Sequence, residues 1–129
     1  MEYNKEELIR YRISRSEETI QEAKDSIEGK HYFSANNRIY YAIFYIVSAL
    51  SIKKEYSTSK HSQLLGWFNK EYIHSGLLSK EYGKIYKNAF ESRQESDYDD
   101  FIEITEEEIN YNYSEMLKFT DKIKEIINT

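Results

Sequence analysis

The sequence of 129 residues contains no cysteine and no proline, and it contains only four glycines. The absence of cysteine excludes disulfide bonds, cysteine–zinc sites and thiol catalysis, and it fits a cytoplasmic protein. With no proline and so little glycine, few positions interrupt a helix, so we expect a chain that is mostly helical. The net charge of −5 provides no global positive field that would attract nucleic acid, which leaves only a local basic patch for that role.

The sequence also lacks an apolar run long enough to cross a membrane. Its longest nonpolar stretch is IYYAIFYIVSAL, residues 39–50, whereas a spanning helix needs about 20 residues. The N-terminal stretch MEYNKEELIRYR is charged throughout and carries no apolar signal core. We therefore expect a soluble, cytoplasmic protein with no membrane partner.

Apolar residues recur at helical spacing along most of the chain. Together with start and stop signals they predict five helices: about 4–28, about 32–53, about 60–72, from about 79 past 90, and from the capping box TEEE at 105–108 onward. The second helix is nonpolar nearly all round, which is typical of the centre of a bundle or of an oligomer interface. Short connections between long helices predict an all-α fold, a single domain over residues 1–129 that forms an elongated up-and-down bundle of four to five helices.

Two arginines stand among apolar residues. Arg93 lies three residues after Phe90 and seven after Tyr86, so it continues the inward stripe of the fourth helix. Asp97, four residues further on, would neutralise it as a structural ion pair. Arg38 either pairs with a carboxylate of the fourth or fifth helix or presents its planar fork to a phosphate. Spacing alone favours the structural interpretation of both arginines.

The remaining candidates have simpler explanations. Three tyrosines follow helical spacing, which is typical of packing, with stacking on RNA bases as the alternative: Tyr40, Tyr41 and Tyr45. Three arginines of the first helix form a basic strip, and the glutamates beside it favour surface ion pairs: Arg10, Arg12 and Arg15. Three histidines have no metal-ligand spacing, so we expect neither a metal site nor a cofactor: His31, His61 and His74.

Two stretches together resemble the HEPN domain family: SANNRIYYAIFY at 34–45 and RQESDYDDF at 93–101. The segment between them is similar in order and spacing, so the resemblance covers about residues 5–127, and it is to the small stand-alone bacterial and archaeal members. This resemblance implies an all-α bundle, a homodimer, and a minimal nucleotidyltransferase as partner in a toxin–antitoxin or related pair. For active members it implies a metal-independent endoribonuclease with an arginine, a spacer of four to six residues, and a histidine.

Carried over onto this sequence, the ribonuclease motif is incomplete. Arg93 matches the arginine, but Tyr98 stands at the histidine position, and no histidine follows. A phenol that titrates near pH 10 is a poor base at neutral pH, and the neighbouring Asp97 disfavours its ionised form. We therefore expect Arg93, Asp97 and Tyr98, together with Arg38, to persist as a polar cluster at a dimer or partner surface.

Three functions compete. The missing histidine favours a protein that is not an enzyme: a HEPN binding domain that dimerises, partners a nucleotidyltransferase, and binds a nucleotide or RNA at the Arg93 cluster. The alternative is a metal-independent HEPN endoribonuclease toxin, in which Tyr98, or a histidine brought in by folding such as His61, moves the proton. The third is an assembly protein whose second helix mediates oligomerisation without any ligand.

Overall fold

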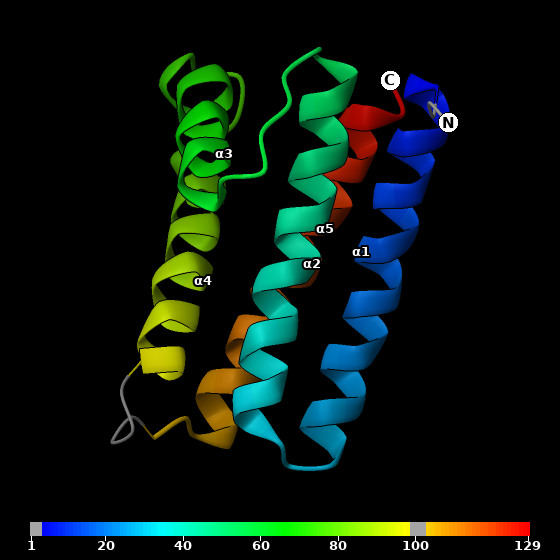
Figure 1. Cartoon of the computed structure of the whole chain (residues 1–129). Helices are drawn as coiled ribbons and strands as arrows, with labels where there is room; N and C mark the ends of the chain where they lie inside the picture. The colour runs from blue at the N-terminus through cyan, green and yellow to red at the C-terminus, as the bar shows by residue number, and fades with distance from the viewer. Residues whose placement is uncertain (1–3, 99–102) are drawn as a thin grey trace.

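The computed structural model describes residues 4–98 and 103–129, apart from the side chains of residues 96–98. Within these ranges all regular secondary structure is helical, which confirms the predicted all-α bundle (Figure 1). The elements are α1 (Lys5–Glu28), α2 (Tyr32–Lys53), α3 (His61–Phe68), the π-helix η1 (Asn69–His74), α4 (Lys80–Tyr98) and α5 (Glu106–Ile127). In the same ranges, no helix combines the length and the apolar character that a membrane crossing requires.

Capping side chains fix the first residues of α1 and α5. The side chain of Asn4 accepts a hydrogen bond from the backbone N–H of Glu7 at 2.8 Å. Thr105 does the same for Glu108 at 3.1 Å, as the capping box predicts. Each bond satisfies one of the backbone donors that a helix leaves without an intrahelical partner. The starts of these two helices are therefore encoded locally, and the sequence prediction placed both within about one residue.

The third predicted helix changes its winding partway along. The sequence predicts one helix over about 60–72, but α3 ends at Phe68 and the chain continues as the π-helix η1. In this wider winding, the ring of Tyr72 is buried and lies 5.7 Å from the ring of Phe68, nearly parallel to it. Apolar periodicity over so few residues does not distinguish an α-helix from a π-helix, so this feature was not predictable.

Helix α2 is the centre of the bundle. It packs against α1, α3, α4 and α5 (Figure 1). The apolar residues around the helix are buried, and Ile43, Val47 and Leu50 are fully inaccessible to solvent. Burying a side chain of this size contributes about 1.5–3 kcal/mol each. The nonpolar run therefore serves the core of a single chain, which was one of the two roles that its composition predicts.

Tilted and edge-on aromatic rings join α3, α4 and α5. The ring of Phe68 lies 5.6 Å from Tyr86 and 5.5 Å from Phe119, and the Tyr86 and Phe119 rings are 5.8 Å apart. Tyr86 is fully buried, and its hydroxyl has no hydrogen-bond partner among the described residues. Burial accordingly raises the pKa of Tyr86 well above its ordinary value. A buried hydroxyl without a partner costs about 1–3 kcal/mol.

Two phenol-to-phenyl substitutions should therefore have opposite effects on stability. We expect Tyr86→Phe to leave the free energy of unfolding unchanged or to raise it by about 1 kcal/mol, because it removes an unsatisfied hydroxyl. Tyr40→Phe should lower it by about 1 kcal/mol, because the Tyr40 hydroxyl lies 2.7 Å from His61 Nδ1. Urea unfolding with unchanged m-values measures both. Equal losses in the two variants would mean that the Tyr86 hydroxyl is satisfied.

Candidate functional site

The guanidinium of Arg93 faces α2, as its position on the inward stripe of the fourth helix predicts. Its Cζ lies 5.2 Å from the centroid of the Tyr40 ring and 5.3 Å from that of Tyr41. Both distances are within the range of a cation–π interaction. The neighbouring Ser92 is held by the side-chain amide of Asn36, which donates to the Ser92 carbonyl at 3.2 Å and to its Oγ at 3.1 Å. The C-terminal part of α4 is thus anchored on α2 beside the arginine.

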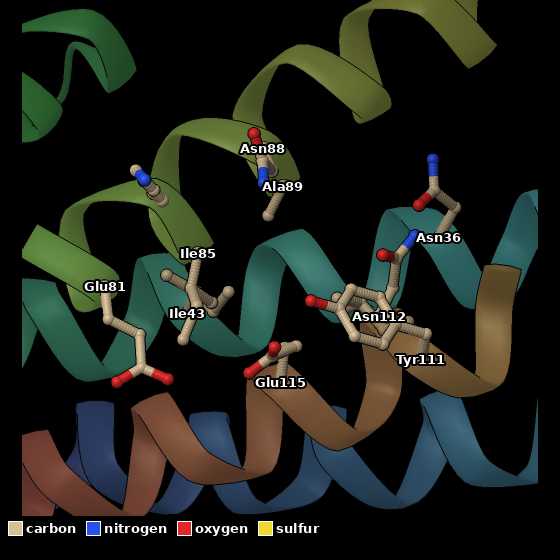
Figure 2. Close-up of a pocket in the computed structure, with 11 residues that line it drawn as sticks. Asn36, Ile43, Glu81, Ile85, Asn88, Ala89, Tyr111, Asn112 and Glu115 are labelled. Atoms are coloured by element: carbon tan, nitrogen blue, oxygen red, sulfur yellow. The ribbon is translucent and has the colours of Figure 1, made fainter.

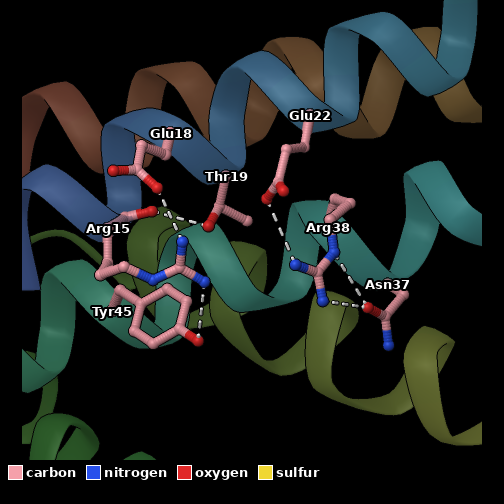
Figure 3. A network of polar contacts seen from close by, with 7 residues as sticks. All are labelled: Arg15, Glu18, Thr19, Glu22, Asn37, Arg38 and Tyr45. Carbon is pink, nitrogen blue, oxygen red and sulfur yellow. Dashed lines mark hydrogen bonds and ion pairs between the residues drawn. The ribbon is translucent and has the colours of Figure 1, made fainter.

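Arg38 lies against the same tyrosine ring. Its Cζ is 5.3 Å from the centroid of Tyr41. Its Nη1 lies 3.3 Å from Glu22 Oε1, and its Nη2 donates to Asn37 Oδ1 at 2.7 Å (Figure 3). The structure thus brings Arg38 and Arg93 together on one ring, although they come from different helices. We call Arg38, Tyr41 and Arg93 the arginine cluster.

The expected carboxylate partner of Arg38 was wrong. The sequence predicts a glutamate or aspartate from the fourth or fifth helix, but Glu22 belongs to α1. The short connection between α1 and α2 makes them an antiparallel pair, and this places Glu22 opposite Arg38 (Figure 3). The side chain of Arg38 remains 28% exposed and that of Glu22 is 51% exposed. The pair therefore lies at the surface, where such contacts contribute about 0–1 kcal/mol.

His61, the first residue of α3, lies next to the arginine cluster. Its ring stacks on Phe44 with centroids 4.3 Å apart and an angle of 14° between the planes. Its Nδ1 lies 2.7 Å from the hydroxyl of Tyr40, the ring that Arg93 also contacts. From the sequence, His61 is a candidate only as a histidine that folding brings to the site. Its approach depends on how α3 packs on α2, a tertiary contact with no local signal.

The surroundings of the His61 imidazole and the Tyr40 phenol favour the neutral form of each group. Burial lowers the pKa of the His61 imidazole, and the positive charge of Arg93 lowers it further. Burial raises the pKa of the Tyr40 phenol, although the same charge opposes this effect. At pH 7 the pair is therefore a neutral imidazole beside a protonated phenol. One nitrogen of that imidazole is already engaged by the phenol hydroxyl.

The rest of the predicted motif can be placed only by its backbone. Asp97 and Tyr98 belong to the last turn of α4, and their side chains are outside the described residues, as is all of 99–102. The proposed Arg93–Asp97 pair and the role of Tyr98 therefore stay predictions. Among the described residues, no group of three histidine, aspartate or glutamate side chains is placed to hold a metal ion.

A cleft between α4 and α5 was not foreseen from the sequence. It has a volume of about 320 Å³ and an apolar floor that includes Ile39, Ile43 and Ile85. Figure 2 shows the hydroxyl of Tyr111 and the carboxylate of Glu115 directed into it. Among the described residues that line this cleft, Lys84 is the one cation and no arginine is present. The cleft is therefore chemically different from the arginine cluster, because its lining residues offer no guanidinium to a phosphate.

Fold and site together define an all-α bundle with two arginines and a histidine gathered on the tyrosines of its central helix. Residues 9–128 match the model of the family described as HEPN domain. The chain belongs to the HEPN domain family. This agrees with the resemblance found in its two motifs, and it covers nearly the whole chain.

Three relatives align over most of their length. A protein of Thermotoga maritima named "UPF0332 protein" is 41% identical over 123 residues, which are 95% of this chain and 93% of the relative. Two proteins of Methanocaldococcus jannaschii, each named "Putative toxin", are 35% and 32% identical. Their alignments cover 89% and 94% of this chain, and 78% and 90% of the relatives.

The environment of His61 predicts a pH-dependent component of stability. Because the pKa of His61 is lowered on folding, the unfolded chain binds its proton more readily than the folded chain does. The stability that depends on a neutral His61 is fully present above the unfolded pKa of about 6.5. It is lost as the pH falls from there through the pKa of His61 in the folded chain.

We therefore expect His61→Gln to lose less stability than the wild type on acidification from about pH 7 to pH 5. Urea unfolding at several pH values measures this, with His74→Gln at an exposed position as the matched control. Parallel pH profiles for the wild type and His61→Gln would contradict the lowered pKa.

Proposed function

We propose that this chain is a non-catalytic HEPN domain that binds a phosphate-bearing ligand, a nucleotide or RNA, at the arginine cluster. It does so as a homodimer and as the cytoplasmic partner of a minimal nucleotidyltransferase in a toxin–antitoxin type of pair. The observation that carries the proposal is the placement of Arg38 and Arg93 against the single ring of Tyr41. Membership of the HEPN family and the toxin names of two relatives support the toxin–antitoxin part of the proposal.

The cluster has the physical properties that phosphate binding needs. A guanidinium offers two parallel donors that match two phosphate oxygens. The tyrosine ring restricts both arginine side chains in advance, so less rotamer entropy is lost when the ligand binds. Glu22 competes for Arg38, but it does so as a half-exposed ion pair of low strength. A phosphate that contacts both arginines replaces that pair with stronger, bidentate bonds.

The same surroundings disfavour bond cleavage. Cleavage of RNA needs a group that removes the proton of the 2′-hydroxyl while a cation stabilises the phosphate. His61 is neutral, as a base must be, but its Nδ1 is engaged by Tyr40 and its ring is stacked on Phe44. Tyr98, at the histidine position of the family motif, is a phenol and too weak a base at pH 7. The site therefore holds a phosphate without a positioned base.

Binding should depend on both arginines and should leave the RNA intact. We expect Arg93→Gln and Arg38→Gln each to weaken binding of a labelled single-stranded RNA at least tenfold, about 1.4 kcal/mol, in fluorescence anisotropy at low salt. Lys87→Gln is the charge-matched control, because Lys87 is exposed on α4 and pairs only weakly, at 3.9 Å from Glu91. Wild-type protein that binds neither RNA nor nucleotide would contradict the proposal.

A second candidate function is a metal-independent endoribonuclease toxin, and one observation favours it. His61 contacts the Tyr40 ring that Arg93 also contacts, so folding supplies an imidazole near the arginine that the linear motif lacks. This candidate predicts Arg93-dependent cleavage that is also lost in His61→Gln. It would be excluded by intact RNA over a broad panel. Tyr98→His tests whether the remaining geometry is competent, because it restores the family motif.

A further inference from the structure

A second arginine–tyrosine pair lies beside the arginine cluster. The Cζ of Arg15 is 5.1 Å from the centroid of the Tyr45 ring, and its Nη2 lies 3.5 Å from the Tyr45 hydroxyl. Its Nη1 contacts Glu18 Oε2 at 2.8 Å (Figure 3). The pair therefore repeats the pattern of Arg38, which also has a ring beneath it and a glutamate of α1 beside it.

The two sites are adjacent on one face. Tyr41 and Tyr45 are one helical turn apart on α2, a rise of about 5–6 Å, and their ring centroids are 6.0 Å apart. Figure 3 shows Arg15 and Arg38 in the space between α1 and α2, on the same side of both helices. A nucleic acid strand carries one phosphate for each nucleotide. Two anchored guanidiniums about one turn apart suit a flexible strand that carries successive phosphates.

The glutamates on this face are more exposed to solvent than the arginines that they contact. The side chains of Arg15 and Arg38 are 27% and 28% exposed, whereas those of Glu18 and Glu22 are 61% and 51% exposed. Each arginine is therefore held by its ring, while each carboxylate lies largely in solvent. Exposed ion pairs of this kind contribute at most about 1 kcal/mol. Rotation of the glutamates away would leave two positive forks on the surface.

We infer that Arg15 and Tyr45 form a second phosphate subsite, so that the ligand is a single strand with successive phosphodiesters rather than a mononucleotide. This inference rests on the proposed function, because the arginine cluster supplies the first phosphate site. The strand lies along α2, between Arg93 and Arg38 at one end and Arg15 at the other. Because the whole chain carries a net charge of −5, binding is sensitive to salt and to each local carboxylate.

The salt dependence of binding tests the second subsite. The probe is a labelled single-stranded RNA of about ten nucleotides, and its affinity is measured over a range of salt concentrations. We expect Arg15→Gln to reduce the slope of log affinity against log salt by about 0.7 and to lower the affinity about tenfold at low salt. Affinity for a mononucleotide should stay unchanged. Arg10→Gln, at an exposed position of the same helix, should retain the wild-type slope.

A gain-of-function variant keeps the test independent of folding defects. We expect Glu18→Gln to bind the strand more tightly than the wild type, because it removes the carboxylate that competes for Arg15. Glu125→Gln, an exposed position on α5, makes the same change in net charge and should have less effect. Equal gains in the two variants would show that only net charge matters and would overturn the subsite.

The outcomes separate this inference from the proposed function. If Arg93→Gln abolishes binding while Arg15→Gln changes neither slope nor affinity, the subsite is wrong and the proposed function stands. If Arg93→Gln is also without effect, the proposed function fails. Arg15→Gln should reduce the slope of log affinity against log salt equally for single-stranded DNA of the same sequence. A reduction seen with RNA alone would contradict a phosphate contact. A changed oligomeric state of Arg15→Gln in light scattering would instead identify this face as a protein interface.

Discussion

The contact of the Arg93 guanidinium with the Tyr40 and Tyr41 rings is the interaction on which the site depends. A half-buried positive charge at the inner face of a helix is costly without compensation. The electron-rich faces of two rings supply part of that compensation and fix the side chain. Those rings belong to α2, which other helices surround. The core therefore holds the rings in place, and the rings hold the arginine.

This charge has consequences for its neighbours. It lowers the pKa of His61 in the same direction as burial, and it partly opposes the effect of burial on Tyr40. The Arg93 guanidinium also contacts the Tyr41 ring, which Arg38 contacts as well. Two cations are therefore close together in a chain whose net charge is negative. Such an arrangement suits a divalent anion better than it suits a proton-transfer reaction. The same arrangement keeps Arg93 in contact with α2, although the sequence has Tyr98 where the ribonuclease motif has its histidine.

The structural features that the sequence predicts are those with local causes. Apolar spacing and the cap at Thr105 placed the helices, and the phase of the fourth helix turned Arg93 inward. The parts that it missed depend on how helices meet. Glu22 reaches Arg38 through the α1–α2 pairing, and His61 reaches Tyr40 through the packing of α3. The cleft is likewise lined by residues of α2, α4 and α5, which only the packing of these helices brings together. None of these contacts leaves a pattern in neighbouring residues.

Nuclear magnetic resonance of the arginine side chains tests most directly whether Arg93 and Arg38 bind one ligand together without cleaving it. In a titration with single-stranded RNA, the Nε–H signals of Arg93 and Arg38 should shift together and saturate at one ligand concentration. The RNA recovered from the same sample should be intact. Unshifted signals in the presence of bound RNA would place the ligand elsewhere. Shifted signals accompanied by cleaved RNA would show that the arginine cluster is a working active site.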